Sequence, residues 1–346
     1  MTGIQHARHV LRLSASVLMV FLLTCHTGKA EELSIKLGFP VDCTLGEDCW
    51  TVNYLDVDPS ENAQDFTCSY KTYDTHKGTD FAVRNYKDML AGVPVKAAAS
   101  GTVLRTRDGE SDLPKTEKEY KVLLDSDIGC GNGVIIKHTD NIETQYCHLK
   151  EGSLRVKSGD IIEKGQVIGF IGQSGAASFP HLHFGITKDG QHIDPYTGHF
   201  ISEGCDVSTL TNLWEDQLGY EPYTVFDAGF RSAIPDWEKI KMGTDPNPEV
   251  LPLDSPNFVY WIGYYHAHAG DQIEMTIYDP NGEVLAESAT TLKQGKKVYY
   301  QYVGSSLKTK KLVPGMYFGV THLKRKGYPK RALTHQVKVK HSINDD

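Results

Sequence analysis

Short apolar runs, separated by glycine and polar residues, dominate the chain between residues 79 and 194. Each run is four to six residues long, and they lie at residues 93–97, 101–104, 133–137, 145–149, 166–171 and 181–186. Runs of this length and spacing are typical of antiparallel strands, whereas a βαβ fold would place helical patterns between them. We therefore predict an antiparallel β-sheet domain in this part of the chain.

A second series of apolar runs follows towards the C-terminus, and it alternates in the period-2 manner of half-buried strands. The runs lie at residues 258–263, 272–278, 298–303, 315–320 and 336–340, with a turn sequence at 279–282. About 90 residues with this pattern predict a small immunoglobulin-like β-sandwich over residues 251–342. The expected fold class is all-β, with one short helix near residues 236–242.

The long apolar run at the N-terminus has the features of an export signal. Arg8 and Arg12 precede an apolar stretch at residues 13–24, and small residues follow around Ala30. This charged, apolar, small-residue order is that of a secretory signal, and the run is too short for a comfortable transmembrane helix. We predict a signal peptide over residues 1–30 and a periplasmic or extracellular protein. A lipid anchor at Cys25 is not expected.

The composition fits a folded globular protein, with 40% hydrophobic and 23% charged residues and a net charge of −8. The charge is uneven, because residues 291–344 contain 13 Lys or Arg and no acidic residue. Clusters at 308–311 and 324–331 predict contact with an anionic envelope polymer, and the alternative is a solvated strand face. We expect no nucleic-acid partner, and we expect a monomer.

Seven cysteines are present, and one of them lies in the predicted signal. The other six are Cys43, Cys49, Cys68, Cys130, Cys147 and Cys205. An even number in an exported chain indicates disulfides rather than a metal cluster. Cys130 and Cys147 lie on two runs that form a predicted hairpin, so we expect them to pair. The remaining four allow three connectivities, and Cys43–Cys49 with Cys68–Cys205 is one of them.

Three histidine motifs lie in the first predicted sheet domain. They are His76-Lys-Gly-Thr-Asp80, Tyr146-Cys-His148 and His181-Leu-His183. Residues two or four apart on a strand share a face, so the side chains within the first and last motifs can converge. A hydrolytic zinc site needs three His or carboxylate ligands and one open position. A single strand histidine is more often a core residue, but three such motifs together predict a metal site.

The order of these motifs resembles the LytM/lysostaphin-type zinc endopeptidases over about residues 70–196. The resemblance rests on His76-x-Gly-x-Asp80-Phe, Gly131-Asn-Gly, Tyr146-x-His148-Leu and Pro-His181-Leu-His183-Phe. It implies a peptidase domain at residues 31–205 with a loop-rich N-terminal segment. A connector at 206–250 would then join it to the sandwich.

The resemblance also implies roles for the site residues. His76, Asp80 and His183 would bind Zn²⁺. His148 and His181 would be the catalytic residues that move protons, and which of them is the general base stays open. The implied reaction is hydrolysis of peptide bonds in peptidoglycan stem peptides or cross-links. The alternatives are an exported protease that acts on other proteins and a non-catalytic module that binds the envelope or activates an amidase.

A charged insertion and a second histidine pair lie outside this resemblance. Residues 108–127 form a charged insertion, which could act as a lid or as a wall that selects substrates. A second His-x-His pair, His266-Ala-His268, has no His-x-x-x-Asp partner nearby in the sequence. We interpret that pair as one face of a sandwich strand.

Overall fold

The computed structural model describes residues 1–2, 33–126, 128–205, 212–245, 247–307 and 311–340. The predicted signal peptide, with Cys25, therefore lies outside the described residues apart from its first two positions. Residues 308–310 of the first basic cluster lie outside them as well. In the described part of the chain, no helix combines the length and the apolar character that crossing a membrane requires.

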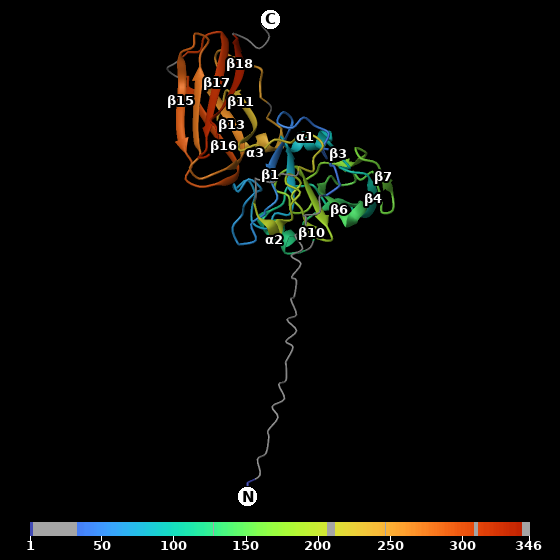
Figure 1. The fold of residues 1–346 in the computed structure, drawn as a ribbon. Coiled ribbons are helices and arrows are strands. Elements are labelled where there is room, and N and C mark those ends of the chain that lie inside the picture. The colour runs from blue at the N-terminus through green and yellow to red at the C-terminus, as the bar shows by residue number, and fades with distance from the viewer. Residues whose placement is uncertain (3–32, 127, 206–211, 246, 308–310, 341–346) are drawn as a thin grey trace. The chain divides into compact units, whose positions relative to one another are not determined.

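Among the described residues, eight strands form one antiparallel sheet, which we call the main sheet (Figure 1). Its order is β1-β2-β9-β6-β5-β4-β7, and β10 pairs with β9. The strands are β1 (Cys49–Asn53), β2 (Thr79–Val83), β4 (Gly101–Arg107), β5 (Asn132–Lys137), β6 (Ile142–Leu149), β7 (Ile161–Ile162), β9 (His181–Lys188) and β10 (Gln191–His192). A separate pair consists of β3 (Pro94–Lys96) and β8 (Val167–Phe170). Each of the six predicted runs overlaps one of these strands, so the antiparallel prediction is confirmed.

Alternation along β9 separates the core from the candidate chemistry. Leu182, Phe184 and Ile186 are buried on one face, and the two histidines of the strand project from the other. Trp214 packs behind the sheet, with its ring centroid 5.4 Å from that of Phe184. Trp214 lies in the segment predicted to be a connector, but it belongs to the core of the main sheet.

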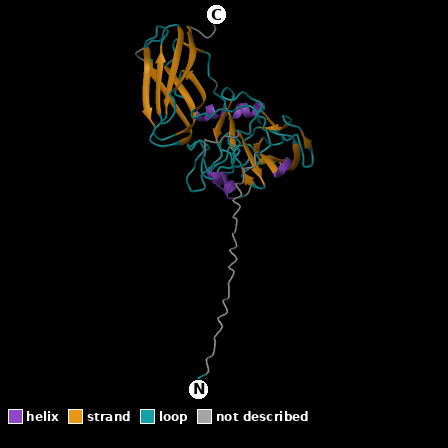
Figure 2. Cartoon of the chain, viewed as in Figure 1, coloured by secondary structure: helices purple, strands orange, loops and turns teal. Residues whose placement is uncertain are grey.

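Helices are few and short in the described part of the chain (Figure 2). They are α1 (Tyr86–Ala91), α2 (Glu117–Asp125), α3 (Trp237–Met242) and the 3₁₀ turns η1 (Thr139–Asn141) and η2 (Ile201–Glu203). The helix expected near residues 236–242 is α3. The charged insertion at 108–127 contains α2, which begins at a capping box formed by Thr116 and Glu119.

Two further sheets follow towards the C-terminus. One has the order β11-β13-β16, and the other has the order β12-β18-β17-β14-β15. Their strands are β11 (Thr224–Arg231), β12 (Val250–Pro252), β13 (Asn257–Ala267), β14 (Gln272–Tyr278), β15 (Val284–Thr291), β16 (Lys296–Ser306), β17 (Gly315–Lys324) and β18 (Arg331–Lys340). Both sheets contribute to one core cluster, for example Phe258 and Tyr260 from β13 and Met275 from β14. The strand series begins at β11, inside the segment that the sequence analysis assigned to the connector.

Three disulfides cross-link the described chain. Cys43 bonds to Cys49, Cys68 to Cys205, and Cys130 to Cys147. The last of these joins the loop before β5 to β6 and therefore staples the hairpin that carries His148.

Candidate active site

His76, Asp80 and His183 converge on one face of the main sheet, and we call these three side chains the metal-ligand group. Asp80 on β2 lies directly opposite His183 on β9. Oδ1 of Asp80 lies 2.9 Å from Nδ1 of His183 and 3.1 Å from Nε2 of His76. The two imidazole nitrogens are themselves 3.1 Å apart. Three potential ligand atoms therefore meet at one point.

A backbone contact of His76 directs the lone pair of its other ring nitrogen to that point. Nδ1 of His76 donates to the carbonyl oxygen of Tyr54 across 2.7 Å, which leaves the lone pair on Nε2. Ligand atoms at about 2.0–2.1 Å from a tetrahedral zinc ion lie roughly 3.3 Å from one another. The observed separations of 2.9–3.1 Å are close to that value, so the group fits a zinc ion.

Asp80 is held in its ionised form, the form that can bind a metal ion. Burial alone would raise the pKa of this carboxyl, since Asp80 is only 1% exposed. The neighbouring imidazoles of His76, His181 and His183 instead hold the pKa of Asp80 well below its usual range. The second carboxylate oxygen, Oδ2, accepts a hydrogen bond of 2.6 Å from Nδ2 of Asn53.

His148 and His181 lie beside the metal-ligand group as a pair, with ring centroids 4.6 Å apart. Nδ1 of His148 donates to the carbonyl oxygen of Ser174, and Nδ1 of His181 donates to that of Phe179, both across 2.8 Å. Burial is the main cause that lowers the pKa of both rings, and the pKa of His148 falls well below its usual value. Both are therefore neutral imidazoles with a basic Nε2.

Two backbone features shape this site. His148 adopts a φ of 61°, a left-handed conformation that is uncommon for a residue other than glycine and is typical of functional positions. Gly78 approaches His183 so closely that an added Cβ would lie 2.7 Å from Nε2 of that ring. A larger residue at the glycine of the His76-x-Gly-x-Asp80 motif would therefore displace His183.

The C-terminal sheets contribute residues around the site that the sequence analysis missed. Nε2 of His266 on β13 lies 2.6 Å from Oδ1 of Asn53, the same side chain that donates to Asp80. The ammonium group of Lys297 on β16 lies 4.2 Å from the ring centroid of Tyr73. The His266-Ala-His268 pair was a visible signal, but we interpreted it only as a strand face. Asn53 lies in a segment with loop-like composition and gave no signal.

Tyr120, in the insertion at 108–127, interacts electrostatically with Asp80. Burial, and to a smaller extent the charge of Asp80, raises the pKa of Tyr120 on α2. The same two causes, in the same order, raise the pKa of Tyr73. The charge of Asp80 thus contributes to the pKa of both phenol groups, one of which belongs to α2.

Comparison with known proteins agrees with this geometry. The sequence pattern of "Peptidase family M23" matches residues 74–195. "DD-carboxypeptidase/endopeptidase Mpg" of Neisseria meningitidis serogroup B is 31% identical over 36% of this chain and 23% of its own length. "Peptidoglycan DD-endopeptidase ShyA" of Vibrio cholerae is 32% identical over 34% of this chain and 22% of its own length. The chain thus spans less than a quarter of the length of these curated relatives.

Among solved structures, the catalytic domain of the prophage-encoded M23 protein EnpA from Enterococcus faecalis is similar at 27% identity, with a TM-score of 0.29. The similarity covers 42% of this chain and 88% of that one. The family match includes every residue of the metal-ligand group together with His148 and His181. Residues 74–195 therefore form a peptidase domain of family M23, the LytM/lysostaphin type.

Proposed function

We propose that this chain is an exported zinc-dependent endopeptidase that hydrolyses peptide bonds in peptidoglycan stem peptides or cross-links. The observation that carries the proposal is the convergence of His76, Asp80 and His183 next to two neutral imidazoles. His76, Asp80 and His183 hold the zinc ion, and His148 and His181 are the catalytic residues. Family membership and the names of the relatives support the choice of peptidoglycan as substrate.

The mechanism divides the work between the two groups of side chains. A bound zinc ion supplies a Lewis acid that polarises the scissile carbonyl and makes water more acidic. Nε2 of His148 or His181 accepts the proton of the attacking water, whose oxygen bonds to the carbonyl carbon. The resulting imidazolium is costly in a buried site, so it passes the proton to the nitrogen of the leaving amine as the carbon–nitrogen bond breaks.

Export is supported by the cysteines as well as by the predicted signal peptide. Three disulfides lie within the described chain, and such bonds persist in oxidising compartments outside the cytoplasm. We accordingly assign the protein to the periplasm or the extracellular space.

The C-terminal region is proposed to be an immunoglobulin-like sandwich. Two sheets that share one buried core support this architecture. Its basic surface is proposed to bind an anionic envelope polymer, but part of that charge is already paired. In the cluster at 324–331, Arg325 binds Asp271, Lys330 binds Glu274 and Arg331 binds Glu221.

Digestion of purified sacculi by the mature protein, followed by mass spectrometry of the products, tests the proposal. We expect release of muropeptides with newly formed amino and carboxyl ends, and a chelator should abolish it. If the protein cleaves a panel of other proteins but leaves the sacculi undigested, the exported protease is favoured instead. Zinc binding with no cleavage of either would favour the non-catalytic module.

A further inference from the structure

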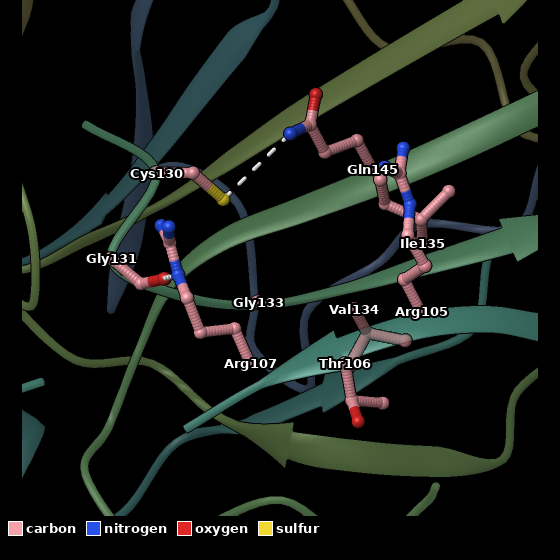
Figure 3. A pocket seen from close by; sticks show the side chains of 9 residues that line it. All are labelled: Arg105, Thr106, Arg107, Cys130, Gly131, Gly133, Val134, Ile135 and Gln145. Carbon is pink, nitrogen blue, oxygen red and sulfur yellow. Dashed lines mark hydrogen bonds between the residues drawn. The ribbon is translucent and has the colours of Figure 1, made fainter. Parts of the chain in front are cut away.

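A cavity of about 330 Å³ lies over β4, β5 and β6, and the mechanism above makes no use of it. Two arginines, Arg105 and Arg107, belong to its lining together with Ile135, Gln145 and Cys130 (Figure 3). No acidic side chain is among the described residues that line it. The charged groups at this cavity are therefore positive, and they suit an anionic ligand.

The cavity opens on the same face of the main sheet as the metal-ligand group. Arg105 on β4 lies opposite Ile135 on β5, which lies opposite Gln145 on β6. Gln145 lies opposite Gly185 on β9, two residues along from His183. Because alternate residues of a strand share a face, this row of side chains lies on the face from which His183 projects.

The separation of the two sites is set by the strand spacing. From β9 to β4 the sheet crosses three inter-strand intervals of about 4.8 Å each, or roughly 14 Å in all. An extended peptide advances about 3.3 Å per residue, so roughly four residues would cover this distance. A substrate lying across the strands could occupy both sites at once.

The two guanidinium groups differ in how they are held. Arg107 donates from Nε to the carbonyl oxygen of Gly131 across 2.6 Å and from Nη2 to that of Ile128 across 3.1 Å. Figure 3 shows the Arg105 and Arg107 side chains leaving β4 on the side opposite Thr106. The Arg105 side chain is exposed, and it has no ion pair or hydrogen bond with any described residue. One guanidinium is thus positioned by the fold, and the other is available to a ligand.

We propose that Arg105 and Arg107 form a carboxylate-binding subsite that receives an acidic group of the substrate roughly four residues from the scissile bond. A guanidinium presents its N–H groups as a planar fork that matches a carboxylate. Peptidoglycan stem peptides carry free carboxylates along their length, so the subsite rests on the proposed function and refines it. Arg105 supplies the main contact, and Arg107 adds charge and shapes the wall.

The test compares two purified cross-linked muropeptide dimers, one with free stem carboxylates and one with those carboxylates amidated. For the zinc-loaded wild-type protein, we expect KM to be about tenfold lower for the free dimer and kcat to agree within about twofold. Arg105→Gln should bring the ratio of the two KM values close to one, and Arg105→Lys should retain part of it. Arg155→Gln is the matched control, because Arg155 is an exposed arginine that stacks on Phe170 outside the cavity.

The outcomes separate the subsite from the function on which it rests. Turnover of both dimers with equal KM by the wild-type protein would overturn the subsite alone. If the ratio of the two KM values is unchanged in Arg105→Gln, the subsite alone is again overturned. Absence of turnover of either dimer by the wild-type protein would overturn the proposed function and the subsite with it. Since Arg105 is exposed, we expect its variants to melt at the wild-type temperature.

Discussion

The imidazole of His266 donates from Nε2 to Oδ1 of Asn53 across 2.6 Å, although 213 residues separate the two in the chain. Asn53 donates from Nδ2 to Asp80, so its Oδ1 is the atom that must accept. Burial is the main cause that lowers the pKa of His266 well below its usual value, so the ring is neutral and carries a single N–H. The C-terminal sheets thereby orient a residue of the metal-ligand group.

We expect His266→Ala to weaken zinc binding by up to about 10-fold, because it removes the donor that orients Asn53, the hydrogen-bond partner of the proposed ligand Asp80. His266→Gln should recover part of the loss, because its side-chain amide can donate to Asn53. Zinc affinity is measured by competition with a chelator, and His268→Ala is the control. If His266→Ala lowers the melting temperature but leaves zinc affinity unchanged, His266 has only a structural role.

The metal content of single variants separates ligands from proton carriers. Alanine at His76, Asp80 or His183 should remove zinc together with activity, since each residue offers one of the three proposed ligand atoms. Alanine at His148 or His181 should leave near-stoichiometric zinc and lower turnover by about 10²-fold or more. Metal analysis of the five purified proteins decides the matter. Zinc loss in His181→Ala with retention in His183→Ala would invert the assignment of that pair.

The disulfide between Cys130 and Cys147 should contribute measurably to stability. Replacing both Cys130 and Cys147 by alanine removes a cross-link that closes a 17-residue separation. We expect the free energy of unfolding to fall by about 2–5 kcal/mol, the usual range for exported domains. Urea unfolding of the oxidised proteins measures the loss. Titration of the native wild-type protein with a thiol reagent should find no reactive cysteine, and two or more would contradict the pairing.

Asp194 should make stability depend on pH. Burial is the main cause that raises the pKa of this carboxyl to about 7, and among the described residues its Oδ2 has no hydrogen-bond partner. The unfolded chain ionises near pH 3.9, so the stabilisation from this group is complete below that pH and is lost as the pH rises to about 7. Asp194→Asn cannot ionise and should therefore gain stability relative to the wild type across this window.

This gain should be at most about 1.4 kcal/mol per pH unit, and it should level off above pH 7. Urea unfolding of both proteins at pH 5, 6 and 8 measures the difference, and the titration of other groups cancels in the comparison. Asp160→Asn is the control, because that carboxylate lies in an exposed turn. A stability difference between Asp194→Asn and the wild type that stays constant over this range would exclude an elevated pKa.

Exposed lysines of the C-terminal region should strengthen binding of the protein to the envelope. The lysines in question have no ion pair among the described residues. Lys311, Lys324 and Lys326 are exposed and remain available, in contrast to the paired Arg325. We expect the triple Gln variant to bind sacculi more weakly at low salt and to approach the wild type at high salt, because ions screen such attraction. Equal co-sedimentation of the two proteins at low salt would identify these lysines as a solvated face.

The parts of the site that local geometry determines could be predicted from the sequence. Alternation along β9 places His181 and His183 on one face whatever the rest of the fold does. The contact of Asn53 with Asp80 depends instead on the pairing of β1 with β2, which no local pattern reveals. The role of His266 depends on its φ of 54° and on the approach of two sheets, both of which are set by tertiary packing.

The insertion at 108–127 could have been predicted more fully. Its Thr116-x-x-Glu119 sequence is a helix-start signature, and the structure forms both of the corresponding hydrogen bonds. The density of charge in this segment favoured the interpretation as a lid or wall and obscured that signal. The beginning of the C-terminal strands was misjudged for a related reason, since β11 is recognisable as part of a sheet only beside β13.

The carbonyl oxygen of Tyr54 and the amide of Asn53 belong to a segment that precedes the family match at 74–195, yet they hold His76 and Asp80. A fusion protein that contained only residues 74–195 would lack the hydrogen-bond partners that orient His76 and Asp80. The segment of chain that forms this site is therefore longer than the segment that matches the family. A recombinant that keeps these hydrogen bonds has to include β1 and β13 along with the histidine motifs.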